Sequence, residues 1–130
     1  MNKEVVIPAT LQAVSNFTAG LDALLVELPM EVRVKVVLAV QELCVNIVEH
    51  AYDGVEGDIV MQIHWNPTQL ELEVVDRAPK EFQPPAEVTA PDPFSLPEGG
   101  MGLFILHHSF DEVTYSREQD RNIWKLQKTL

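Results

Sequence analysis

Three polar side chains at steps of four residues, Glu42, Asn46 and His50, interrupt an otherwise apolar stretch of the sequence. In a helix this spacing places them on one face, one turn apart. A carboxylate and a carboxamide so arranged can divide chemical labour. Asn46 can offer a neutral oxygen to a hard cation such as Mg²⁺, while Glu42 accepts a proton from an attacking hydroxyl group. The alternative is a solvated helix edge that carries ordinary polar residues.

Two further groups of residues have types and positions suited to chemistry. Asp76 ends an apolar run and enters a loop, where its carboxylate can accept a hydrogen bond from a nucleobase amino group; strand-ending turns also use aspartate. The segment Gly99-Gly100-Met101-Gly102 precedes a short apolar stretch. At a helix start, glycines let backbone N–H groups approach an anion closely, helped by the helix dipole. The alternative for this segment is a flexible hinge.

The surrounding sequence predicts the elements that must position these residues. Thr10 is a suitable N-cap for a helix that Pro29 ends, and the long stretch from Met30 to Tyr52 predicts a second helix, apolar over much of its circumference and therefore buried. A third, short helix is expected at 103–108. Period-two alternation and turn residues predict strands at 4–7, 59–65, 70–74, 112–116 and 123–128, with turns at 66–68 and 117–121.

The chain of 130 residues predicts one domain, residues 1–130. The order of elements favours an α/β (α+β) two-layer sandwich, with helices packed on one face of a mixed, mostly antiparallel sheet. The segment at about 78–98 holds six of the nine prolines and is too long for an idle connection, so we predict a lid or binding loop there.

Composition excludes several classes of function. Nine Lys and Arg residues against twenty Asp and Glu give a formal charge of −11, which disfavours nucleic acid or an anionic membrane surface as the main partner. The single cysteine, Cys44, excludes a disulfide scaffold and is expected in the core. No apolar run approaches the ~20 residues of a spanning helix, and no signal-peptide pattern opens the sequence. A cytoplasmic location is expected.

Taken together, the three groups resemble the N, G1 and G2 boxes of the Bergerat-fold (GHKL) ATP-binding superfamily, and within it the anti-sigma-factor serine kinases of the RsbW type. Residues 37–52 and 99–106 carry the likeness most strongly, and it spans nearly the whole chain. The resemblance implies binding of ATP and Mg²⁺, with Glu42 as the general base and Asn46 as the Mg²⁺ ligand. The nucleotide-binding positions that it implies are Asn46, His50, Asp76, Ala78, Gly99, Gly100, Met101, Gly102 and Leu103.

The same resemblance implies a protein-serine kinase that phosphorylates a STAS-type anti-sigma antagonist, sequesters a sigma factor in some members and is commonly a homodimer. Three departures stand against it: Ala78 and Lys80 replace the two glycines of the G1 pattern, and no threonine stands near Asn122. These departures leave open a non-catalytic partner-binding module with weak or no ATP turnover. A third reading is an ATP hydrolase that acts alone.

Overall fold

The computed structural model describes residues 2–52, 55–78 and 100–130. The order of elements agrees with the prediction, except that a π-helix, η1, continues the second α-helix. In chain order the elements are β1 (Asn2–Pro8), α1 (Leu11–Leu24), α2 (Met30–Asn46), η1 (Ile47–Tyr52), β2 (Asp58–Trp65), β3 (Gln69–Asp76), α3 (Gly100–Ser109), β4 (Glu112–Glu118) and β5 (Arg121–Thr129).

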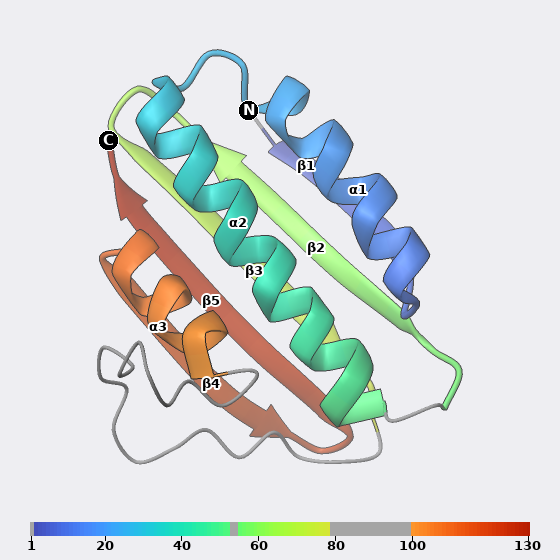
Figure 1. Ribbon diagram of the computed structural model, residues 1–130. Coiled ribbons are helices and arrows are strands. Elements are labelled where there is room, and N and C mark those ends of the chain that lie inside the picture. The colour runs from blue at the N-terminus through green and yellow to red at the C-terminus, as the bar shows by residue number, and fades with distance from the viewer. Residues whose placement is uncertain (1, 53–54, 79–99) are drawn as a thin grey trace.

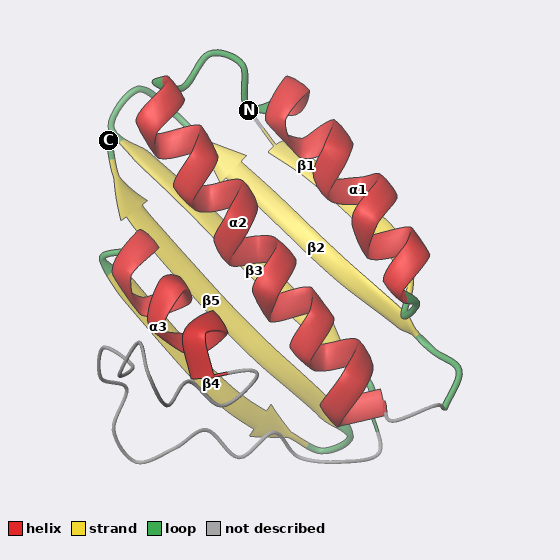
Figure 2. Cartoon of the chain, in the orientation of Figure 1, coloured by secondary structure: helices red, strands yellow, loops and turns green. Residues whose placement is uncertain are grey.

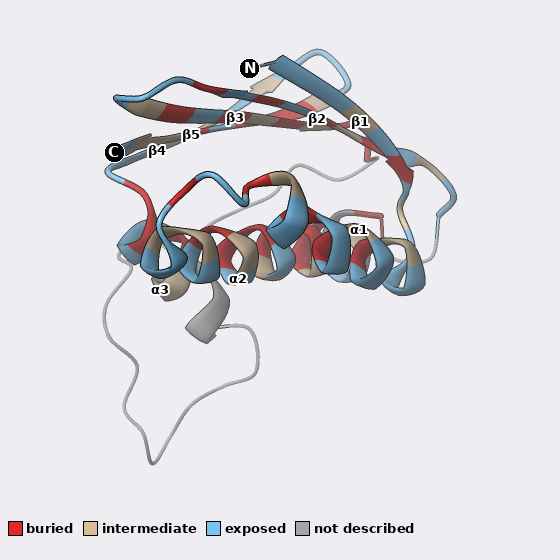
Figure 3. Cartoon of the chain, turned by 90° about the horizontal axis from the view of Figure 1, so that it is seen from above, coloured by how far each residue is buried: buried red, intermediate tan, exposed pale blue. Residues whose placement is uncertain are grey.

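The five strands form one sheet in the order β1-β2-β3-β5-β4, and every one of its four pairings is antiparallel. All three α-helices lie on the same face of this sheet, with α2 running across its middle (Figure 1, Figure 2). Seen from the side, the described residues form two layers, and none of their helices lies on the other face of the sheet (Figure 3). The predicted two-layer α+β fold class is confirmed, and the described sheet is entirely antiparallel rather than mixed.

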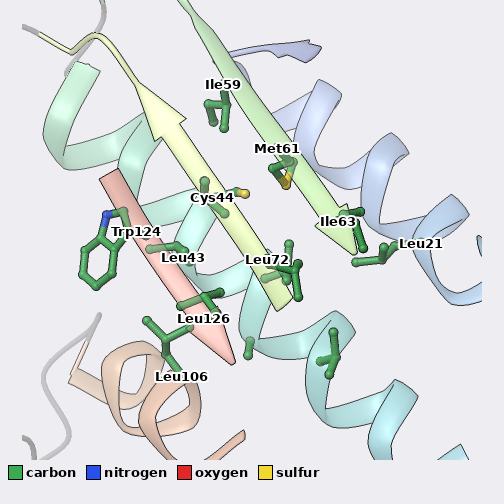
Figure 4. Packing of buried hydrophobic residues seen from close by; sticks show 14 of the residues in the cluster. Leu21, Leu43, Cys44, Ile59, Met61, Ile63, Leu72, Leu106, Trp124 and Leu126 are labelled. Carbon is green, nitrogen blue, oxygen red and sulfur yellow. The ribbon is translucent and has the colours of Figure 1, made fainter. Parts of the chain in front are cut away.

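The core fills the space between the two layers because the strands alternate in sequence. On β2 the residues Ile59, Met61, Ile63 and Trp65 are buried, while the residues between them are exposed or half-buried. The side chains of α2 that face the sheet pack against them, as Figure 4 shows for Leu43 and Cys44 beside the strand residues. Burial of this apolar surface supplies the main driving force for the fold.

The prediction that the long helix would be buried on most sides is wrong. Met30, Val34 and Leu38 of α2 are 69 %, 57 % and 41 % exposed. A two-layer sandwich covers a helix from one side only, so the apolar residues on the far side of α2 remain in solvent. The apolar pattern of the helix therefore overstates its burial.

The residues that the sequence predicts to cap a helix and to close a hairpin turn do so in the structure. The Thr10 hydroxyl accepts a hydrogen bond from the Ala13 N–H at 3.1 Å and caps α1. Asn66 Oδ1 accepts bonds from the N–H groups of Thr68 and Gln69 at 2.9 and 3.0 Å, which closes the turn between β2 and β3. Helix α1 ends at Leu24, before the predicted Leu28, and the turns that follow bury Leu25 and Leu28.

Among the described residues no helix combines the length and the apolar character that crossing a membrane requires. Of the predicted lid at about 78–98, only Ala78 belongs to the described residues. The other positions of the predicted lid, Lys80 among them, lie outside the described residues.

Candidate functional site

Asp76 lies at the end of β3, directly across from Asn122 near the start of β5. Its side chain is buried, with 1 % of the residue exposed. Oδ1 accepts hydrogen bonds from Asn122 Nδ2 at 2.9 Å and from the Ala78 N–H at 3.0 Å. The other oxygen, Oδ2, is buried and has no hydrogen-bond partner among the described residues. A buried carboxylate oxygen without a donor is an acceptor available to a ligand.

Burial and neighbouring groups have opposite effects on the pKa of Asp76. Burial raises the pKa of the Asp76 carboxyl above its usual value. The hydrogen bonds from Asn122 and Ala78 and the charge of Arg117 act in the opposite direction and lower that pKa. Arg117 also donates from Nη1 to the Ala78 carbonyl at 3.1 Å, which ties β4 to the residues that follow β3.

Tyr52 joins the end of the helical segment to the ends of two strands. Its hydroxyl donates to the Asp58 carbonyl at 2.6 Å and accepts from the Arg77 N–H at 3.1 Å. Gly57 lies against its ring, and a Cβ there would come within 2.2 Å of Tyr52 Cε1. A glycine is therefore required by close approach. The sequence patterns did not single out Tyr52, although a hydroxyl-bearing aromatic at the end of a helix was a visible signal.

Glu42 and Asn46 lie four residues apart within α2, so they share a helix face as predicted. Asn46 is buried, with 7 % of the residue exposed, and Glu42 is half-buried. The chain changes from α- to π-helix immediately after Asn46. The wider π-turn, with i→i+5 hydrogen bonds, ends the four-residue periodicity before His50. The side chain of His50 lies outside the described residues.

The charge of Asp76 acts on Cys44 of α2. Cys44 is fully buried in the core, as predicted, and burial raises the pKa of its thiol to about 12, with the charge of Asp76 contributing in the same direction. Asp76 also raises the pKa of Tyr52, after burial, which is the largest cause. The hydrogen bond from the Arg77 N–H to the Tyr52 hydroxyl brings η1, which continues α2, to the end of β3. Figure 1 shows the same arrangement.

The glycine segment lies at the start of α3, which begins at Gly100, three residues before the predicted start at Leu103. Gly100, Met101 and Gly102 therefore occupy the first turn, where backbone N–H groups have no partner within the helix. The N-terminal end of the helix dipole favours an anion at this point. Helix α3 packs beside α2. Gly99 lies outside the described residues, as do the side chains of Met101 and Leu103.

The sequence patterns did not predict a role for Asn122. At this position they showed only that a threonine is absent, whereas the structure places Asn122 fully buried beside Asp76. Its Oδ1 also accepts a hydrogen bond from the Tyr115 hydroxyl. A polar residue within an apolar strand was the available signal. The pairing of β3 with β5, which sets Asn122 opposite Asp76, was not part of the predicted topology.

Other features of the described residues lie away from this site. A hollow of about 410 Å³ on the open face of the sheet is lined mainly by polar side chains such as Gln62, Glu73 and Lys125, and by none of the predicted site residues. Within the described ranges, no three His, Cys, Asp or Glu side chains gather as a metal site. A Mg²⁺ ion bound to the protein through the Asn46 amide oxygen alone would not need such a cluster.

The chain is similar to several known proteins. The model of the histidine kinase-like ATPase domain family matches residues 7–128. The serine-protein kinase RsbW of Bacillus pumilus is 34 % identical over 85 residues, which are 58 % of this chain and 52 % of that protein. The protein of the same name from Bacillus thuringiensis is 27 % identical over 93 residues, or 66 % and 58 % of the two chains. The chain thus spans somewhat more than half the length of these curated relatives.

Two solved structures share the fold. One contains the RsbU and RsbW domains of a Mycobacterium tuberculosis protein, with a TM-score of 0.70, 18 % identity, and coverage of 98 % of this chain and 32 % of that one. The other is the histidine kinase domain of a blue-light-activated kinase from Erythrobacter litoralis, with a TM-score of 0.61, 14 % identity, and coverage of 95 % and 61 %. Since the family model matches nearly the whole sequence, the chain belongs to the histidine kinase-like ATPase domain family of the GHKL superfamily.

Proposed function

We propose that this chain is an ATP-dependent protein-serine kinase that regulates partner proteins. The observation that carries the proposal is the buried Oδ2 of Asp76, which has no hydrogen-bond partner among the described residues. Glu42 and Asn46, on one face of α2, accompany it. Membership of an ATPase domain family and relatives named serine-protein kinase RsbW support it.

The residues present fit a bound Mg·ATP. Asp76 Oδ2 is an acceptor for the exocyclic amino group of adenine. The N–H groups in the first turn of α3, at Gly100 to Gly102, are suited to phosphate oxygens. Asn46 offers an amide oxygen of the kind that Mg²⁺ accepts in proteins. His50, Ala78, Gly99, Met101 and Leu103 complete the proposed nucleotide-binding set, of which Ala78 already donates to Asp76.

The proposed reaction transfers the γ-phosphoryl group of ATP to a serine. Glu42 accepts the proton of the serine hydroxyl, the seryl oxygen bonds to the γ-phosphorus, and the bond to the β,γ-bridging oxygen breaks to leave ADP. In such transfers a protein acts mainly by positioning the reactants and neutralising charge. Half-burial of Glu42 on the same helix face as Asn46 is consistent with this division of roles.

The partner that we propose is a STAS-type anti-sigma antagonist that carries the target serine, with a sigma factor as a second protein that the same domain sequesters. We also propose a homodimer and a cytoplasmic location. The likeness to proteins named RsbW supports this assignment.

The test is incubation of the protein with Mg·ATP and a STAS-domain partner, followed by mass spectrometry of the partner. Phosphoserine is expected on the partner with the wild-type chain and is expected to be lost with Glu42→Gln. Asn46→Ala should abolish Mg²⁺-dependent nucleotide binding while the fold is retained. Unchanged phosphoserine in Glu42→Gln would overturn the proposed role of the carboxylate.

A second candidate function is a partner-binding module with little or no ATP turnover. The replacement of glycines by Ala78 and Lys80 favours it. In the same experiment, a stable complex with the partner and no phosphoserine would support this alternative. Steady release of inorganic phosphate without any partner would instead indicate a hydrolase.

A further inference from the structure

We infer that Asn122, held by Tyr115, makes the site selective for adenine over guanine by occupying one oxygen of the Asp76 carboxylate. The inference rests on the proposed nucleotide site and assigns Asn122 as a positioning residue that acts through Asp76. Three observations carry it: the hydrogen bonds to Oδ1, the absence of any described partner at Oδ2, and the fixed direction of the bonds between Tyr115, Asn122 and Asp76.

The two carboxylate oxygens of Asp76 differ in their hydrogen bonding. An ionised carboxylate oxygen has two acceptor positions. At Oδ1 both are taken, by Asn122 Nδ2 at 2.9 Å and by the Ala78 N–H at 3.0 Å. At Oδ2 no described residue donates. The carboxylate therefore presents one acceptor atom to a ligand.

One free acceptor atom suits one nucleobase better than the other. Adenine presents a single amino group, N6, on its recognition edge. Guanine presents two adjacent donors, N1–H and the N2 amino group, and a carboxylate binds both only when both of its oxygens are available. With Oδ1 occupied, paired recognition of guanine is lost. Asn122 thus disfavours the binding of guanine as well as favouring the binding of adenine.

Tyr115 fixes the orientation of the Asn122 amide. Because Nδ2 faces the carboxylate, the amide oxygen faces Tyr115, and the phenol must donate its proton to it. The Tyr115 ring is in turn held against the Trp124 ring, with centroids 4.8 Å apart at an interplanar angle of 46°. Removal of the phenol hydroxyl takes away the bond at Asn122 Oδ1 that favours this orientation, so an amide turned with its oxygen toward the carboxylate becomes less disfavoured.

The same bond affects the proton affinity of Asp76. The Asn122 bond lowers the pKa of the carboxyl, against the larger effect of burial, so removal of the amide should raise that pKa further. A protonated carboxyl is a poorer acceptor, so the acid limb of nucleotide binding should move to higher pH. Among the described residues, the other titratable or charged groups acting near Asp76 are Arg117 of β4, Cys44 of α2 and Tyr52 of η1.

The experiment measures the Kd of Mg·ATP and Mg·GTP by calorimetry from pH 4.5 to 8 for the wild type, Asn122→Ala and Tyr115→Phe. Ser116→Ala serves as the control, because it removes a hydroxyl next to Tyr115 from an exposed position on the other face of the strand. For Asn122→Ala we expect an ATP affinity about tenfold weaker and a GTP-to-ATP Kd ratio reduced about tenfold. Its acid limb should lie at higher pH. Tyr115→Phe should show the same changes at roughly threefold.

The outcomes separate this inference from the proposed function. If the wild type binds neither nucleotide, the proposed nucleotide site is wrong and the inference fails with it. If the wild type binds ATP and both variants keep its affinity, base preference and acid limb, only the inference is overturned. A uniform loss for both nucleotides with an unmoved acid limb would indicate mere structural damage and also overturn it. Should Asn122→Ala fail to fold, Tyr115→Phe decides, since it removes one hydroxyl from a half-buried side chain.

Discussion

Two neighbouring pairs of residues on the same face of the sheet differ sharply in character. Val74 of β3 lies across from Trp124 of β5, and two residues along the strands Asp76 lies across from Asn122. All four side chains are buried. The first pair contributes to the apolar core, whereas the second replaces apolar contact with hydrogen bonds and leaves one carboxylate oxygen without a described partner. The core therefore ends, and the site begins, within one step of the strand alternation.

Burial alone therefore does not separate the apolar core from the candidate site. Burying a carboxylate costs free energy unless hydrogen bonds compensate, and here they compensate at one oxygen only. An incompletely compensated group is a cost to stability that a ligand can relieve. Substitutions in the two regions should accordingly separate stability from ligand affinity.

The largest expected effect is on stability and comes from the core. Met61→Ala removes a fully buried side chain of β2 and should lower the free energy of unfolding by about 2–5 kcal/mol. Chemical denaturation checks the value. Nucleotide affinity of the folded fraction at low temperature should stay unchanged, and a parallel loss of affinity would mean that core and site are not separable.

The next largest effect is expected on ATP affinity, from a substitution of Asp76. Asp76→Asn keeps one oxygen that can accept the bonds from Asn122 and Ala78. It removes the negative charge and replaces the acceptor Oδ2 with an amide nitrogen, which donates. ATP affinity should fall by roughly 2–3 kcal/mol, or about a hundredfold in Kd. Calorimetry measures the affinity and thermal unfolding measures the fold. Wild-type affinity in this variant would remove Asp76 from the site.

The pH dependence of the free energy of unfolding also distinguishes the candidate site from the apolar core. The pKa of Asp76 is raised in the folded state, so the folded protein binds more protons than the unfolded chain between the ordinary aspartate value and the folded value. Asp76 therefore contributes a stability loss as pH rises through that window, and the loss is absent below it. Asp76→Asn should flatten this part of the stability profile, which urea denaturation at several pH values would reveal. An identical slope in the two proteins would contradict the assignment.

A smaller effect is expected where η1 meets the strand ends. Gly57→Ala places a Cβ against the ring of Tyr52, which is buried and hydrogen-bonded through its hydroxyl to Asp58 and Arg77. Because the ring cannot move without loss of these bonds, stability should fall by about 1–3 kcal/mol. Thermal unfolding measures it. Gly20→Ala is the matched control, since nothing lies within 4 Å of a Cβ there.

The smallest effect is expected far from both regions. Thr10→Ala removes the side-chain cap of α1 and should cost about 1 kcal/mol of stability, with no effect on nucleotide binding. Denaturation and calorimetry on the same preparation check both statements. A change in nucleotide affinity would show that α1 is coupled to the site.

Local features of the fold could be predicted from the sequence because each depends on neighbouring residues. Thr10 caps a helix through its own side chain, and Asn66 closes a hairpin within its own turn. The alternation of β2 and β3 likewise reports which of their residues face the helices. The shared face of Glu42 and Asn46 follows from helix geometry alone.

Features that depend on distant parts of the chain could not be predicted in this way. The bond from Asn122 to Asp76 joins residues 46 positions apart, and it requires the register of two strands that are not consecutive. The contacts of Tyr52 depend on where β2 and β3 end relative to η1. The π-helix after Asn46 left no sign in the apolar periodicity.

The position of β5 between β3 and β4 has a consequence for how the protein is made. During synthesis, β1 to β3 can pair with one another soon after they leave the ribosome, because each joins its predecessor in the sheet. The hydrogen bond between Asp76 and Asn122 forms later, because β5 follows both α3 and β4 in the sequence. The Asp76 carboxylate is therefore held by Asn122 only after β1, β2 and β3 have been synthesised and can already pair.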